Sequence, residues 1–170
     1  MKRVVIPVAL CVLLAACFKS EHLLVDLGTA AHPIPEGEWV AGDSSDTVFT
    51  LKINGDHYLR TEDKNTYDLV LVPLAGHAGT FVAAESSEGC TGHDATPECN
   101  WEYAIVVVGE DGTWKQSAPD CKQAWDGMDK DVAKVEDDGE TCWFDDAAGL
   151  QHALAVAADR PSSNEQVVHR

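Results

Sequence analysis

Basic side chains are scarce in this chain of 170 residues, which has 12 Lys and Arg against 29 Asp and Glu and a formal net charge of -17. Proteins that bind nucleic acid place clusters of Lys and Arg against the phosphates, so this shortage argues against a nucleic-acid partner. It also argues against electrostatic binding to anionic lipid headgroups, whereas an acidic surface attracts cations or basic partners. Hydrophobic residues make up 45% of the chain, so we expect one globular domain and not a disordered acidic chain.

The motifs of common catalytic and cofactor sites are also missing. The sequence contains no His-Glu-x-x-His, no Gly-x-Ser-x-Gly, no phosphate-binding P-loop and no dinucleotide-binding glycine pattern. We therefore predict no catalytic residues, no metal and no cofactor, and expect the protein not to be an enzyme.

The apolar run at the N-terminus is too short to cross a bilayer. It extends for eleven residues from Val4 to Leu14 and follows Lys2 and Arg3, whereas a membrane-spanning helix needs about 20 residues. A positively charged start before such a run is typical of a signal peptide. We therefore expect an exported protein.

The end of this run, Leu14-Ala15-Ala16-Cys17, resembles the lipobox of bacterial lipoproteins, in which an aliphatic and two small residues precede an invariant cysteine. The resemblance implies removal of residues 1–16 and a diacylglycerol thioether on Cys17, often with an acyl group on the new amino terminus, so that lipid holds the protein on a membrane. More than one acyl chain is needed for stable anchoring. Phe18 takes the place of the Asp that retains enterobacterial lipoproteins in the inner membrane, which implies the periplasmic face of the outer membrane. The alternatives are an ordinary secretory peptide cleaved near Ala15-Ala16 or a retained hydrophobic anchor.

Six cysteines are present, of which Cys11 leaves with the signal peptide and Cys17 carries the lipid. Four cysteines remain, and an even number of cysteines in an exported protein predicts two disulfides. Among the three possible pairings we favour the two that close the shortest loops, each contributing roughly 3 kcal/mol of stability. These pairs are Cys90–Cys99 and Cys121–Cys142. The alternative for Cys90 and Cys99 is a zinc site with His93, although no Cys-x-x-Cys pair supports it.

Alternating apolar and polar residues predict strands over most of residues 37–144. Phe49, Leu51 and Ile53 alternate with polar neighbours and precede Asn54-Gly55, which is typical of a tight hairpin turn. The stretch Trp101–Val108 is apolar on both faces, which indicates a central strand covered on both sides. The spacing predicts a mainly β fold, an antiparallel meander or small barrel-like sheet that is stapled by the two disulfides.

The predicted domain lies between a tether and a loose tail. Residues 17–36 have little periodicity, so we expect the lipidated cysteine and a tether there. A single β-rich domain, residues 37–158, ends in a helix that Asp145 or Asp146 can cap. Residues 159–170 are polar, which predicts a loose tail. The apolar face of the predicted helix contains Leu150, Ala153, Leu154 and Ala157.

The triplet Gly37-Glu38-Trp39 near the start of the domain resembles the Gly-x-Trp motif of lipocalins. That resemblance implies a barrel with a ligand cavity, into which Tyr103 and Ile105 point. The five tryptophans fill the β core in the simplest interpretation, and some of them line a pocket in the alternative. The candidate lining residues are Trp39, Trp101, Tyr103 and Trp114.

Histidines and acidic residues show no metal-binding spacing. We expect His57, His77 and His93 to be exposed in or beside turns. The acidic residues of 126–146 fail the calcium-binding EF-hand pattern, since positions 5 and 6 counted from Asp129 are Ala and Lys. The function we expect is therefore a non-enzymatic lipoprotein that binds a protein or another envelope component. The alternative is a lipocalin-like carrier of a small apolar or sugar-like ligand.

Overall fold

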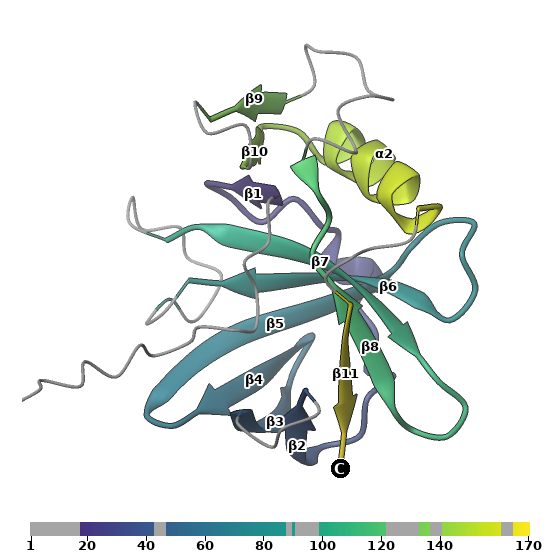
Figure 1. The fold of residues 1–170 in the computed structure, drawn as a ribbon. Helices are drawn as coiled ribbons and strands as arrows, with labels where there is room; N and C mark the ends of the chain where they lie inside the picture. Colours follow the sequence, from purple (N-terminus) through teal and green to yellow (C-terminus); the bar gives the residue numbers. More distant parts are fainter. Residues whose placement is uncertain are drawn as a thin grey trace, which may run out of the picture.

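A closed barrel of eight antiparallel strands dominates the computed structural model (Figure 1). The structure describes residues 18–42, 47–87, 90, 99–121, 133–136, 141–160 and 165–170. The predicted signal peptide, Cys17, His93 and the acidic turn expected at 137–139 lie outside these residues. The mainly β fold, the C-terminal helix and both disulfides, Cys90–Cys99 and Cys121–Cys142, are confirmed.

Seven barrel strands form a meander in which each pairs with the next along the chain. The predicted hairpin turn is present, with Asn54 opposite His57 and Gly55 at a φ of 69°, which glycine adopts readily. The meander consists of β2 (Gly37–Ala41), β3 (Thr47–Asn54), β4 (His57–Glu62), β5 (Asn65–Pro73), β6 (Thr80–Ser86), β7 (Trp101–Val108) and β8 (Trp114–Ser117).

The eighth strand, β11 (Glu165–His169), closes the barrel by pairing with both β8 and β2. This corrects the prediction of a loose tail at residues 159–170. The reason is that Val168 is fully buried inside the barrel, where it lies opposite Trp114 and Ala41. A polar strand with a single buried side chain has too little alternation to be recognised in the sequence.

Three short strands extend the sheet from β7, namely β1 (Phe18–Ser20), β10 (Cys142–Phe144) and β9 (Ala133–Val135). The first half of β7 pairs with β1 and its second half pairs with β8. Residues 18–36, expected to be a tether, are therefore part of the fold. After β1 they form the 3-10 helix η1 (Leu27–Thr29), which packs on β5.

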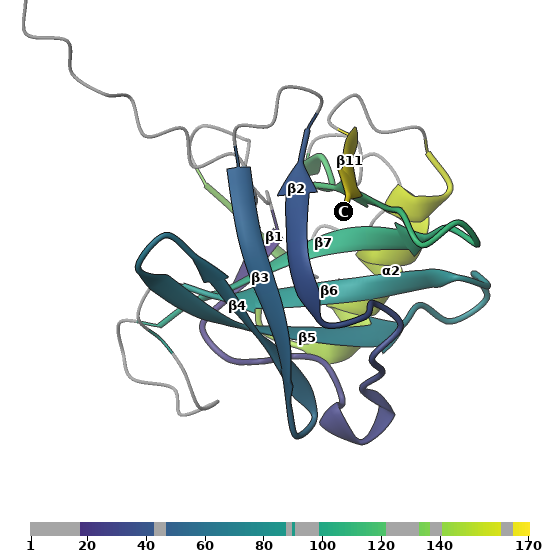
Figure 2. The ribbon, with the colours of Figure 1, turned by 90° about the horizontal axis from the view of Figure 1, so that it is seen from below.

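Two apolar cores lie on opposite faces of the barrel wall. The interior core contains Trp39, Phe49 and Trp114, and the outer core lies beneath α2 (Ala147–Ala158), which packs on β7 and β10 (Figure 2). Asp146 caps α2 by accepting a hydrogen bond from Gly149 N at 2.8 Å, as predicted. Tyr103 and Ile105 belong to the outer core, so the expectation that they point into the barrel is wrong.

Candidate functional site

Inward-facing side chains change from apolar to polar toward one end of the barrel. On β4 the buried Tyr58 is followed, at alternate positions, by Arg60 and Glu62, and on β6 Ala83 is followed by Glu85. This end, which we call the barrel mouth, also carries the turn at 63–64 and the loop after β6. The barrel mouth is formed by Lys19, Arg60, Glu62, Tyr67, Glu85, Glu102 and Gln116.

Arg60 is the centre of the barrel mouth. Its guanidinium group forms ion pairs with Glu85 and Glu62 and lies over the rings of Phe49, at 4.8 Å, and Tyr67, at 5.3 Å. Arg60 and Glu85 are only 5% and 6% exposed. Burial raises the pKa of the Glu85 carboxyl, and the positive charge of Arg60 opposes this rise without cancelling it. The charges are thus held away from bulk water. In this less polar environment they interact more strongly with a polar group than they would in water.

A second ion pair continues the barrel mouth toward β1. Lys19 Nζ lies 2.8 Å from Glu102 Oε1, and Glu102 is directly opposite Glu85 in the pairing of β6 with β7. The barrel mouth therefore holds three carboxylates and two basic groups. Its formal charge is negative by one, which disfavours an anionic ligand.

Aromatic side chains fill the interior below these charges. The ring of Trp114 meets those of Trp39 and Phe49 edge-on, with centroids 6.3 and 6.1 Å apart. The indole Nε1 of Trp114 is buried and has no hydrogen-bond partner among the described residues. Because a buried donor without a partner costs free energy, this N–H is suited to donate to an acceptor brought in by water or a ligand.

The opposite end of the barrel is closed by residues 31–36. Tyr58 Oη donates to Ile34 O at 2.7 Å and accepts from Ile34 N at 3.1 Å, and burial raises the pKa of Tyr58 to about 12. Trp39 Nε1 donates to Pro35 O at 3.2 Å. Arg170 covers the Trp39 ring at 5.1 Å and donates to the backbone oxygen of Glu36 at 3.0 Å. Arg170 therefore packs against the segment that seals this end of the barrel.

The four predicted pocket-lining residues do not gather in one place. Trp39 and Trp114 lie in the barrel interior, whereas Trp101 and Tyr103 lie in the outer core. Tyr103 Oη contacts Ser20 Oγ at 2.7 Å and accepts from Leu24 N at 3.0 Å, which binds the N-terminal segment to the barrel wall. The charged residues of the barrel mouth were not among the site residues predicted from the sequence. The signal was available in the alternation of β4, where Arg60 and Glu62 follow Tyr58 on one face.

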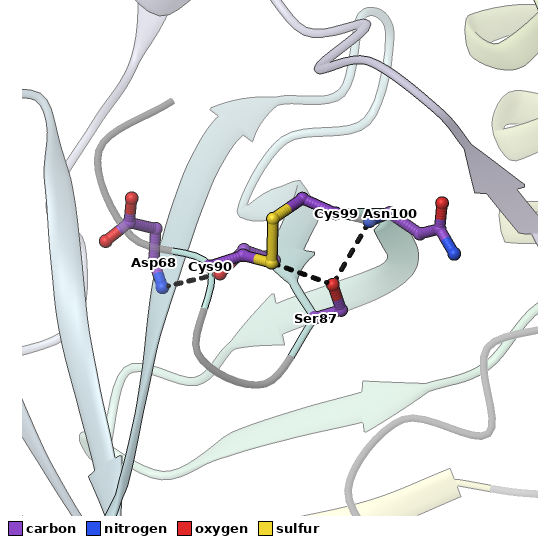
Figure 3. Close-up of a disulfide and its surroundings, with 6 residues drawn as sticks. Asp68, Ser87, Cys90, Cys99 and Asn100 are labelled. Atoms are coloured by element: carbon purple, nitrogen blue, oxygen red, sulfur yellow. Dashed lines mark hydrogen bonds between the residues drawn. A yellow bond between two sulfur atoms is a disulfide. The ribbon is translucent and has the colours of Figure 1, made fainter. Parts of the chain in front are cut away.

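The first disulfide, Cys90–Cys99, lies in the connection between β6 and β7 (Figure 3). Ser87 Oγ accepts from Asn100 N at 3.1 Å and lies 3.2 Å from the sulfur of Cys90. Ser87 N also donates to Asn100 O at 2.9 Å, so the two ends of the loop are joined by backbone as well as by Cys90–Cys99.

The predicted exposure of the histidines is wrong for His57. Its side chain is buried on the outer wall, with Nδ1 2.9 Å from Asp56 and Nε2 3.5 Å from Asp68. His77 lies 3.1 Å from Asp159, and this contact raises the pKa of His77. Among the described residues, no three His, Cys, Asp or Glu side chains are placed to hold a metal ion.

In the described part of the chain, no helix has the length and apolar character needed to span a bilayer. Comparison of the chain with protein-family models, with curated protein sequences and with solved structures gave no match.

Proposed function

We propose that this chain is an exported, lipid-anchored and non-enzymatic binding protein whose barrel mouth takes a small polar ligand rich in hydroxyl groups. The observation that carries the proposal is the buried pair of Arg60 and Glu85, together with a buried indole N–H of Trp114 that has no hydrogen-bond partner among the described residues. A buried ion pair is a poor source of stability, because desolvation offsets most of the attraction. Groups with perturbed pKa values, such as Glu85, are in contrast frequent at functional sites, and the mouths of β-barrels are frequent ligand sites.

The groups of the barrel mouth suit hydroxyls better than other ligand chemistry. A hydroxyl donates to carboxylates such as Glu62, accepts from Arg60 or Lys19, and also accepts from the Trp114 indole. The excess of one carboxylate disfavours phosphate or carboxylate ligands. A sugar or another polyol meets these requirements.

The same interior argues against a carrier of apolar molecules. Trp39, Phe49 and Trp114 contact one another edge-on in the space that an apolar ligand would need. An apolar ligand at the barrel mouth would also displace water from Arg60 and Glu85 without offering hydrogen bonds, which is unfavourable. Of the two ligand classes expected from the sequence, the sugar-like one fits better.

The lipid anchor in this proposal rests on the lipobox at Leu14 to Cys17, preceded by a positively charged start and an apolar run. Acyl chains on Cys17 would hold the acidic barrel at a membrane that its charge does not attract, since loss of Lys2 and Arg3 with the signal peptide leaves 10 basic against 29 acidic side chains. The residue after the cysteine is Phe18 and not the Asp that retains enterobacterial lipoproteins in the inner membrane. We therefore propose that the protein lies at the periplasmic face of the outer membrane.

Native mass spectrometry of the protein extracted from its own membrane tests the proposal. The expected masses are those of a chain cleaved before Cys17, acylated and carrying a small ligand that leaves on activation. The Glu85→Gln variant should lose the ligand. The Glu38→Gln variant should retain it, because Glu38 is exposed on the outer face of β2.

Three outcomes would contradict parts of the proposal. An unacylated chain excludes the anchor, and a bare acylated chain excludes a tightly held ligand. A second polypeptide in place of a ligand would indicate an envelope-protein partner. Such a partner would have exposed apolar side chains available on the barrel wall at Val48, Val107 and Val167.

A further inference from the structure

Strand β1 is fixed in the sheet from its first residue. Phe18 is fully buried, its ring lies 4.9 Å from that of Phe144, and it pairs with Tyr103 on one side and Cys142 on the other. Cys142 is itself bound to Cys121 by a disulfide. The residue that directly follows the proposed lipid attachment site therefore belongs to the rigid body of the protein.

This position leaves no spacer between the anchor and the barrel. Consecutive Cα atoms are about 3.8 Å apart, so lipid on Cys17 would begin within one residue of buried β1. A tethered lipoprotein domain moves freely above the bilayer, whereas this barrel would be held against it.

The same strand connects the anchor to the barrel mouth. Lys19, two residues after Cys17, makes the ion pair with Glu102 at 2.8 Å. Glu102 is directly opposite Glu85, at a Cβ separation of about 5 Å, and Glu85 pairs with Arg60. A short series of neighbouring side chains, from Lys19 through Glu102 and Glu85 to Arg60, therefore connects the anchor to the barrel mouth.

Resting on the proposed lipid anchor and ligand class, we infer that the barrel is mounted directly on the bilayer by β1, with its mouth at the headgroup layer. The hydroxyl-rich ligand is then the sugar headgroup of a neutral glycolipid in the same membrane. A neutral headgroup is required because the barrel mouth carries one more carboxylate than basic groups. A free sugar offers the same hydroxyls, and the experiment separates the two sources.

Energy transfer from the full acylated protein to labelled lipid headgroups tests the mounting. Donor dyes are placed at Lys134→Cys, on β9, which is separated from β1 by β10 alone, and at Lys52→Cys, near the closed end of the barrel; both positions are exposed. Transfer should be stronger from position 134 than from position 52. A 16-residue Gly/Ser spacer inserted after Cys17, which spans about 22 Å on average, should abolish this difference.

Equal transfer from the two positions in a chain whose mass shows acylated Cys17 would overturn the direct mounting and leave the proposed anchor intact. Absence of acylation would overturn both. The mass measured before labelling distinguishes these results.

Native mass spectrometry from phosphatidylcholine nanodiscs that contain a neutral glycosyl diacylglycerol tests the headgroup. The acylated protein should leave the nanodisc with glycolipid bound, Glu85→Gln should lose it and Glu38→Gln should keep it. Glycosylglycerol supplied in solution is the comparison. Retention of glycosylglycerol without retention of glycolipid would show that the ligand comes from solution and would overturn the membrane source.

Discussion

Arg60 and Glu85 show what a single residue of the barrel mouth contributes. Replacing Arg60 with Met leaves the Glu85 carboxylate buried without its counter-charge, which we expect to lower the free energy of unfolding by about 3–5 kcal/mol at pH 7. Urea unfolding of the two proteins measures this loss. Adding Glu85→Gln to the Arg60→Met variant should recover much of it, because no charge then remains buried there. A loss below about 1 kcal/mol, the value typical of exposed pairs, would contradict the buried interaction.

Glu85 also predicts a dependence of stability on pH. Its pKa in the folded protein is raised above the ordinary value of 4.5, so the folded state binds the proton more tightly than the unfolded state. This contribution to stability is complete below pH 4.5 and is lost as the pH rises through the raised pKa. The stability of the wild type relative to Glu85→Gln should therefore fall as pH increases from about 4 to 7. A difference that stays constant over this range would exclude the raised pKa.

At the scale of elements, β11 is the strand whose loss should matter most. A chain that ends at residue 164 lacks the pairing of β11 with β8 and β2 and the buried side chain of Val168. We expect this chain to lose the cooperative unfolding transition seen by near-ultraviolet circular dichroism. Arg170→Ala is the matched milder change, because it removes only the cover over Trp39 and one hydrogen bond, at a cost of about 1 kcal/mol.

The two disulfides should differ in their contribution. Cys121–Cys142 closes the longer loop, with a sequence separation of 21 against 9 for Cys90–Cys99. Loop entropy alone predicts that it stabilises the fold by about 0.7 kcal/mol more. Its position beside buried Phe18 in the outer core adds a packing contribution. The paired Cys→Ser variants, compared by thermal unfolding, should therefore rank in this order, and the reverse order would contradict the account.

The elements also show which parts of the fold could be predicted from sequence. Strand β3 was predictable because its alternation is long and the Asn54-Gly55 turn marks a hairpin, and β7 because it is a long run of aromatic and β-branched residues. Strands β1 and β11 were not, because they are short and their stability comes from partners distant in the chain, such as Tyr103 for Phe18. The inward direction of β7 was misassigned for a related reason. Both faces of that strand are apolar, so its own sequence does not distinguish the two cores.

The candidate site was harder to predict than the fold. The aromatic residues of the interior, Trp39 and Trp114, were among the predicted lining residues. The central contact of the barrel mouth joins Arg60 of β4 to Glu85 of β6 on the inner face of the sheet. No local spacing encodes that contact, since β5 lies between the two strands.

For the whole molecule, the anchor gives the most direct prediction. Cys17→Ser removes the acceptor of the lipid, so the variant should remain an unacylated precursor. Membrane fractionation and the intact mass of the variant measure this. The change lies outside β1, so the variant should keep the near-ultraviolet circular dichroism of the barrel, which serves as the control. A variant that is processed and bound to the membrane at the wild-type level would refute the lipoprotein proposal.

The closing strand of the barrel has a further consequence for when this protein can fold. Because β11 lies at residues 165–169 and pairs with β2 near the start of the barrel, Val168 must find Ala41 across most of the chain. Such distant pairing makes folding slow compared with local hairpin formation. A growing chain in which residues 165–169 have not yet been made also lacks one wall of its barrel. Closure therefore begins only after β11 has been synthesised, so the barrel stays open, and accessible to chaperones, until then.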